Sequence, residues 1–159
     1  MEFKHAGVLD GNDIGKEIYI ACKNLKGIPT IKFKGYINNL EIGLDNIKVN
    51  LSSCLFIHLK AKDKVIVNEC NVKAYNELRH ICLQTSNNMD KLKHLIGKTI
   101  YFASSDNTNS KPVIKNGGTI NDISLSEDTD NVFIKSSNVN STIILPKGDQ
   151  ILIEDQSNC

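Results

Sequence analysis

The feature that most constrains the fold of this chain is that its sequence repeats itself. Residues 14–21 read IGKEIYIA, and residues 96–103 read IGKTIYFA. Further along, VIVNE at 65–69 is matched by ILIED at 151–155. The extra residues of the second copy fall between apolar runs, where loops tolerate changes in length. The repeat therefore predicts an internal duplication of one structural unit; the alternative is two unrelated strand-rich halves that share a biased composition.

Each copy reads almost wholly as short strands. Apolar and polar residues alternate in TIKFKG (30–35), DNIKVNL (45–51) and KVIVNE (64–69), and Gly, Asp and Asn separate such runs. Five short strands can close on themselves and hide their edges, whereas two cannot bury a core. The sequence therefore predicts a mainly all-β protein with two tandem small β-barrels, one at residues 1–70 and one at residues 96–159.

The connection at residues 71–95 is predicted to be a short helical linker. Within VKAYNELRHICLQ (72–84), apolar residues recur at helical spacing: Ala74, Leu78, Ile81 and Cys82. The next segment, NMDKLKHLIG (88–97), offers Asn88 as a helix N-cap and Gly97 as a stop. We expect these helices to pack against the open end of one barrel or between the two barrels.

Charge separates the two copies. Residues 14–69 hold nine lysines against five acidic residues, whereas residues 96–155 hold five lysines against eight. In the first copy, alternation places Phe33 inward and its lysine neighbours outward. Lysines that follow phosphates, beside rings that stack on bases, are the ingredients of single-stranded nucleic-acid binding. The predicted polyanion-binding residues are Lys23, Lys26, Lys32, Lys34, Tyr36, Phe56, His58 and Lys60; the alternative is a lysine face that only maintains solubility and protects strand edges.

The second copy has an additional apolar face. Where the first copy has outward Lys48, His58 and Ile66, the second has these residues: Phe133, Ile144 and Leu152. Large exposed apolar patches mark interfaces, so all of these apolar residues, Ile66 included, are predicted interface residues. Three explanations remain open: packing within this chain, contact with a second copy or a partner protein, and binding of a lipid or small apolar ligand.

No set of residues predicts catalysis, a metal site or a cofactor. The four histidines lie far apart in the sequence, and the five cysteines are scattered without a C-x-x-C pair, which indicates free thiols in a cytoplasmic protein. No apolar run approaches the roughly 18 residues that span a bilayer, and the first residues lack the order of a signal peptide. Heavy use of Asn, Lys and Ile indicates an A/T-rich coding genome, such as that of a low-GC bacterium or its phage.

One fold-level resemblance supports the barrel prediction. IGKEIYI at 14–20, followed by GYINNLEI at 35–42, resembles the opening of Sm-like and Tudor-like small barrels, in which a GK-x-apolar strand leads into a glycine-bent second strand. The resemblance covers both copies and implies the same fold for each. GLDNIKVNL (43–51) partly matches the RNA-reading loop of Sm-like proteins, and an aromatic content of 6% provides no Tudor-type cage. No functional residue is carried over from either family.

The sequence favours a non-enzymatic binding protein. The leading hypothesis is that the basic first copy binds RNA or DNA and that the apolar face of the second copy forms a homo-oligomer. A second hypothesis is an adaptor or inhibitor, encoded by a phage or mobile element, that occupies the surface of a host protein. A third is sequestration of a small anionic ligand, such as a nucleotide, between barrels or between subunits, because ligand sites favour such junctions.

Overall fold

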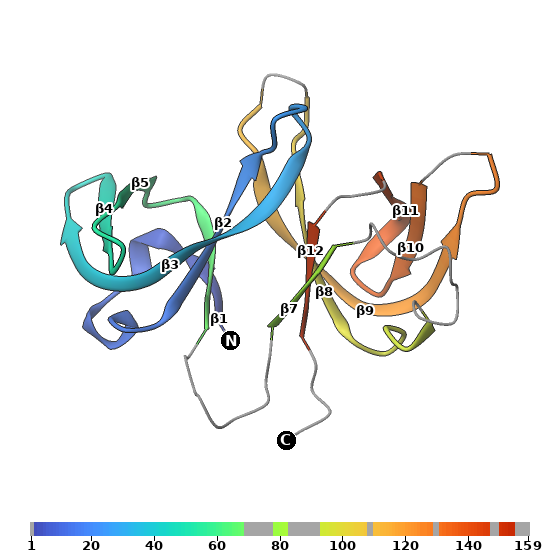
Figure 1. The fold of residues 1–159 in the computed structure, drawn as a ribbon, viewed down its shortest axis with the longest axis horizontal. Helices are drawn as coiled ribbons and strands as arrows, with labels where there is room; N and C mark the ends of the chain where they lie inside the picture. The colour runs from blue at the N-terminus through green and yellow to red at the C-terminus, as the bar shows by residue number, and fades with distance from the viewer. Residues whose placement is uncertain are drawn as a thin grey trace.

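The computed structural model describes residues 2–68, 78–82, 93–107, 110–128, 131–146 and 150–154. Its strands form two six-stranded antiparallel sheets, so the all-β prediction is confirmed (Figure 1). We call the sheet built from β1 to β6 lobe one, and the sheet built from β7 to β12 lobe two. Within the described residues, no helix is long and apolar enough to cross a membrane.

Lobe one has the strand order β1-β6-β2-β3-β4-β5. Its strands are β1 (Glu2–His5), β2 (Glu17–Lys23), β3 (Pro29–Ile42), β4 (Asn46–Leu51), β5 (Phe56–Lys60) and β6 (Lys64–Asn68). Two single-turn 3-10 helices, η1 (Ala6–Val8) and η2 (Gly11–Asp13), connect β1 to β2.

Lobe two has the strand order β7-β12-β8-β9-β10-β11, which is the order of lobe one. Its strands are β7 (Leu78–Cys82), β8 (Thr99–Ser104), β9 (Val113–Leu125), β10 (Asn131–Ser136), β11 (Val139–Pro146) and β12 (Gln150–Glu154). Each strand of lobe two therefore has a counterpart in lobe one, β8 for β2 and β11 for β5 among them.

Local details repeat together with the strand order. The Gly15 N–H donates to the Ile37 carbonyl at 2.7 Å, and the Gly97 N–H donates to the Ile120 carbonyl at 2.8 Å. Both glycines have a positive φ, +87° and +89°, which side chains other than glycine rarely adopt. A β-bulge then follows at the same place in each lobe. These matches fix which residue of lobe two corresponds to each residue of lobe one.

Each sheet curls around an apolar core of its own, because alternate side chains of a strand point to the same face. In lobe one the buried residues are Ala6, Leu9, Ile18, Ile37, Ile47, Val49, Leu51, Leu59, Val65 and Val67. In lobe two they are Leu95, Ile100, Phe102, Ile120, Ile123, Val132, Ile134 and Ile143. The predicted period-2 alternation accounts for core residues such as Val49 and Val65 of lobe one and Val132 and Ile134 of lobe two. Leu55, which the same alternation places inward, is 65% exposed.

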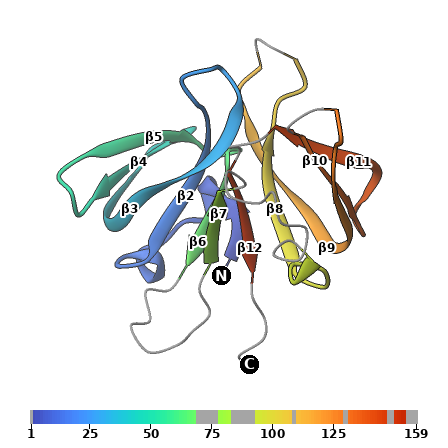
Figure 2. The same ribbon diagram turned by 45° about the vertical axis from the view of Figure 1, so that its right-hand side comes forward.

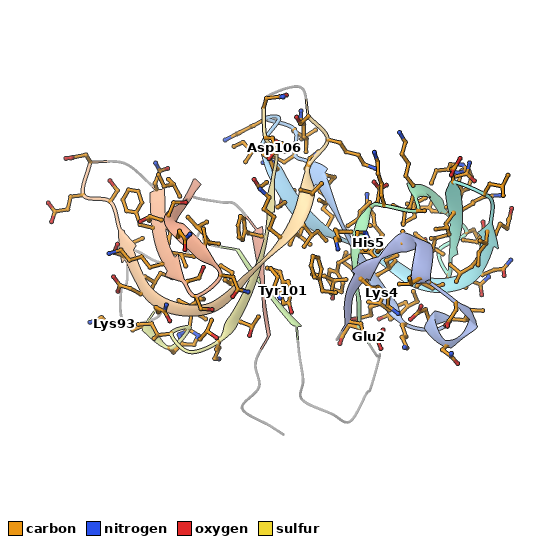
Figure 3. All side chains as sticks on the ribbon, turned by 180° about the vertical axis from the view of Figure 1, so that it is seen from behind. Glu2, Lys4, His5, Lys93, Tyr101 and Asp106 are labelled. Atoms are coloured by element: carbon orange, nitrogen blue, oxygen red, sulfur yellow. The ribbon has the colours of Figure 1, made fainter. Side chains whose placement is uncertain are left out.

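A third apolar cluster, the inter-lobe cluster, joins the outer faces of the two sheets. Its buried members are Tyr19, Ile31, Ile66, Tyr101, Ala103 and Ile114. Figure 3 shows Tyr101 between the lobes, and its ring centroid lies 5.7 Å from that of Phe3 in β1. The Tyr19 hydroxyl donates to Glu17 Oε2 at 3.2 Å, and burial, together with the Glu17 charge, raises the pKa of Tyr19.

The β2–β3 hairpin of lobe one and the β8–β9 hairpin of lobe two lie side by side beyond the cores, as both Figure 1 and Figure 2 show. The turn of the first hairpin is well defined, because the Asn24 Oδ1 accepts from the Lys26 N–H at 2.8 Å and from the Ile28 N–H at 3.0 Å. The β2–β3 hairpin therefore reaches the neighbouring lobe as a preformed element.

The N-terminal strand is fastened to lobe one by a buried carboxylate. Asp13 is only 1% exposed, and the Lys4 Nζ lies 2.8 Å from its Oδ1. The Lys16 Nζ lies 3.4 Å from the same oxygen, and the Asp10 N–H donates to Asp13 Oδ2 at 3.1 Å. Burial alone would raise the pKa of Asp13, but the Lys4 hydrogen bond and the Asp10 N–H hold that pKa below its usual value.

The prediction of a helical linker is wrong for Leu78–Cys82, which form β7 and pair with β12 along its length. The physical reason is the sheet edge: without β7, one side of β12 would present unpaired backbone groups, and edge pairing outweighs a short stripe of helical periodicity. The remaining residues from 71 to 92 lie outside the described residues. Of the second predicted helix, Leu95 is buried in lobe two and Gly97 ends the turn.

Candidate functional site

The predicted polyanion-binding residues fall into two groups in lobe one. The first group lies on the β2–β3 hairpin: Lys23, Lys26, Lys32, Lys34 and Tyr36. Lys32 pairs with Ile20 across the hairpin, and Lys34 is the half-buried residue of the β-bulge. In the sheet of lobe one, β4 lies between β3 and β5, so the two groups are on strands that are not neighbours. The two groups were predicted as one site because alternation indicates which face of a strand a side chain occupies, and does not indicate how far apart two strands lie.

The second group, on β5, consists of Phe56, His58 and Lys60. Phe56 is 55% exposed, and its ring meets the His58 ring edge-on with centroids 5.3 Å apart. The Lys48 Nζ of the neighbouring β4 lies 5.0 Å from the centroid of the Phe56 ring. We call this set the β4–β5 surface. It combines an exposed ring with cationic side chains on one face of the sheet.

Phe33 was predicted to point inward, and the structure leaves it 44% exposed. Its ring lies 5.4 Å from the Tyr19 ring and 5.7 Å from the Tyr36 ring, so it extends the inter-lobe cluster to the surface. The glycine at position 35 was the signal in the sequence that the alternation changes here. Its φ is +136°, and a β-bulge changes the face of the sheet to which the side chains on either side of it point.

The predicted interface residues lie on four strands of the two lobes. Ile66 is fully buried in the inter-lobe cluster, so for this residue the contact lies within the chain. Phe133 is half-buried on β10, and Ile144 on β11 is 57% exposed. Leu152 lies on β12, where its backbone pairs with that of Tyr101. Phe133 and Ile144 are directly opposite each other in the β10–β11 ladder, so their side chains lie on the same face of lobe two.

Ile144 lines a cleft of about 1070 Å³ at the junction of the lobes. The sequence did not predict this cleft. One wall comes from β8 and β11 of lobe two, and the opposite wall comes from the tip of the β2–β3 hairpin of lobe one. The apolar lining includes Phe3, Ile28, Pro29, Phe102, Val139 and Ile144. The polar lining includes Ser104, Lys115, Asn116, Asn138, Ser141 and Thr142.

Lobe one has a pocket at the corresponding place, but its volume is only about 100 Å³. It is lined by Ile20 and Ala21 of β2, by His58 of β5, and by Lys111 and Pro112 of the other lobe's hairpin. In the cleft, the counterparts of these elements are β8, β11 and the lobe-one hairpin. The cleft and the lobe-one pocket are therefore two versions of one structural position.

One ion pair at the lobe-one pocket involves a hairpin residue that differs between the two positions. The Lys111 Nζ donates to Asp63 Oδ2 at 2.6 Å and so closes the β8–β9 hairpin over the lobe-one pocket. Comparison of the two hairpin registers makes Pro29 of lobe one the structural equivalent of Pro112 of lobe two. The residue of lobe one that corresponds to Lys111 is therefore Ile28. Ile28 has no charge and cannot form such a bridge. The cleft thus has no counterpart of the bridge from this hairpin position.

No catalytic group was predicted, and no cluster of three or more His, Cys, Asp or Glu residues positioned to hold a metal occurs in the described residues. No family model matches the chain, and neither a curated protein nor a solved structure matches it. The cleft and the β4–β5 surface are the two features of the described residues that have the geometry of a binding site.

Proposed function

We propose that this protein is a binding protein that holds a small ligand in the cleft between its lobes. The observation that carries the proposal is the contrast between the two equivalent positions, about 1070 Å³ in lobe two against about 100 Å³ in lobe one. Ligand sites are typically clefts of about 300 to 1,000 Å³ at domain junctions, with apolar walls and a few polar groups. The cleft has this size, position and lining.

The proposal is the third of the hypotheses drawn from the sequence, and duplication is part of it. We take the two lobes to be copies of one unit, which their shared strand order and hydrogen bonds support. On this view the copies kept the same framework and diverged at the hairpin position held by Ile28 and Lys111. If the two copies have separate roles, we expect their residues to differ at a position that borders the cavity, as Ile28 and Lys111 do.

Thermal unfolding in the presence of pooled metabolites tests the proposal. A ligand that binds only the folded protein raises the midpoint as its concentration rises. Ser141→Tyr, which places a ring in the cleft from an exposed position of β11, should abolish the shift. Leu55→Tyr is the matched control, because Leu55 is the exposed counterpart of Ser141 and does not line the lobe-one pocket. A shift that survives Ser141→Tyr would place the ligand elsewhere.

A second candidate function is binding of single-stranded RNA or DNA by the β4–β5 surface. The exposed Phe56 ring with His58 and Lys48 beside it favours this candidate. Stacking of one base on an aromatic ring contributes about 1 to 3 kcal/mol, and lysines follow the phosphates.

Fluorescence anisotropy with a labelled single-stranded oligonucleotide tests this second candidate. We expect affinity to fall steeply between about 50 and 200 mM salt and Phe56→Ala to weaken binding by about tenfold. Leu44→Ala is the control, since Leu44 is fully exposed on a turn of the same lobe. If the affinity for the oligonucleotide is unchanged both by salt and by Phe56→Ala, this candidate function is wrong.

A further inference from the structure

The cleft carries one charged residue among its described lining residues, Lys115. The Lys115 Nζ lies 3.7 Å from Asp106 Oδ1, and both side chains are largely exposed to water. An exposed pair of this kind contributes little to stability, so an anionic group of a ligand can replace the Asp106 carboxylate at small cost. No carboxylate lines the described part of the cleft. The lining therefore favours a ligand with a localised negative charge.

The remaining polar lining is uncharged and can both donate and accept hydrogen bonds. It contains the amides of Asn107, Asn116 and Asn138 and the hydroxyls of Ser104 and Ser141. The Gly118 N–H donates to Asn116 Oδ1 at 2.8 Å, which fixes the orientation of that amide. A side-chain amide presents a donor and an acceptor side by side, as does the edge of a nucleobase.

Two strand edges border the same cleft. The pairing of β12 with β8 ends at Tyr101, and β11 pairs only with β10 among the described strands. Phe102–Ser104 pair with β9, and β11 pairs with β10, so each segment has one strand partner and no second one among the described strands where it lines the cleft. Unpaired backbone groups alternate donors with acceptors, and they need a partner wherever water is excluded. A flat ligand with hydrogen-bonding groups on its edge would satisfy them.

Size and apolar surface exclude a simple inorganic anion as the intended occupant. The cleft volume of about 1070 Å³ far exceeds what one phosphate group fills, and Phe3, Ile28 and Ile144 line it with apolar surface. Apolar walls stabilise a ligand only when it has apolar or aromatic faces to bury. The occupant must therefore combine a flat, hydrogen-bonding ring with a negative charge.

We propose that the ligand is of the nucleotide class, with its base in the cleft between the strand edges of β8 and β11 and its phosphate paired with Lys115. This inference rests on the proposed function, because it names the ligand of that same site. Neither the carboxylates nor the metal cluster that would accompany a magnesium-bound triphosphate occurs in the described lining, so a nucleoside monophosphate fits better.

Isothermal titration calorimetry on the full chain tests the inference. The probes are the four common nucleoside 5′-monophosphates, their parent nucleosides, and inorganic phosphate. We expect at least one monophosphate to bind about tenfold or more tightly than its nucleoside, because a charge-assisted hydrogen bond is added. Inorganic phosphate should bind at least about 100-fold more weakly than that monophosphate, because the ring provides most of the contact.

Lys115→Gln should lower the affinity for the monophosphate to that for its nucleoside. Lys135→Gln is the control, because Lys135 is an exposed lysine of β10 in the same lobe that lines neither the cleft nor the lobe-one pocket. It should leave the affinity unchanged. Equal affinity for nucleoside and monophosphate, equally tight binding of phosphate alone, no binding of any monophosphate, or indifference to Lys115→Gln would overturn the inference.

These outcomes are distinct from failure of the proposed function. If a metabolite of another class raises the unfolding midpoint and Ser141→Tyr abolishes that shift, the cleft is a ligand site and only the nucleotide assignment is wrong. If a monophosphate still binds to Ser141→Tyr with unchanged affinity, the cleft is not its site and the proposed function fails with the inference.

Discussion

Ile66→Asp is expected to lower the free energy of unfolding by about 4 kcal/mol or more, and to leave much of the protein unfolded at 37 °C. Ile66 is fully buried between the lobes, where it belongs to the cluster that contains Tyr19 and Tyr101. A carboxylate at this position would lose its hydration among the apolar side chains of the inter-lobe cluster, whose buried members among the described residues include no basic residue. Urea denaturation followed by circular dichroism measures the change.

Ile144→Asp is the matched control for this experiment, since Ile144 is also an apolar strand residue but is 57% exposed. We expect its free energy of unfolding to stay within about 0.5 kcal/mol of the parent protein. Light scattering on the same variant tests the predicted homo-oligomer. A dimer that dissociates on Ile144→Asp would make the rim of the cleft an interface between copies, whereas equal stability of the two aspartate variants would contradict the inter-lobe packing.

Asp13→Asn is expected to destabilise the protein by about 3 kcal/mol at pH 7, because removal of one partner leaves the Lys4 ammonium without its buried counter-charge. Lys4 and Lys16 both contact the Asp13 carboxylate, and Lys4 belongs to the edge strand β1. The variant should therefore also expose β1 to faster hydrogen exchange than β3. Chemical denaturation at pH 7 measures the loss, and exchange rates locate it.

The same carboxylate predicts how stability depends on pH. The pKa of Asp13 is lower in the folded protein than its usual value, so folding favours the ionised form. Its contribution is fully present above the unfolded pKa of about 4 and is lost as the pH falls through the folded pKa. Asp13→Asn should thus reduce the difference between stability at pH 7 and at pH 3. Asp45→Asn, at an exposed turn, should leave that difference unchanged.

Much of the fold follows from local sequence patterns. The period-2 alternation identified core residues such as Val49 and Val65, and the recurrence of Ile-Gly-Lys identified the corresponding turns at Gly15 and Gly97. Such signals depend only on neighbours along the chain. The strand at Leu78–Cys82 was missed because its stability comes from the edge of β12, which is distant in sequence.

The candidate site could not be predicted to the same extent. The cleft forms where the β2–β3 hairpin of one lobe meets two strands of the other, so its lining residues share no sequence window. The correspondence of Ile28 with Lys111 comes from the strand registers of the two hairpins, and the contact of Lys111 with Asp63 shows why the difference between them matters. Comparison of the copies still directed attention to Ile144, which lines the cleft, because the corresponding residue of lobe one is His58.

Each hairpin lines the pocket of the other lobe, and this arrangement determines whether a cleft can form when the protein is scarce. Each lobe supplies one wall of the other lobe's pocket, so separate lobes would have to associate before a cleft existed, and the fraction assembled would depend on concentration. Because the two lobes belong to one chain, their association is intramolecular, with an effective concentration of the order of millimolar. A single molecule therefore carries a complete cleft at any protein concentration.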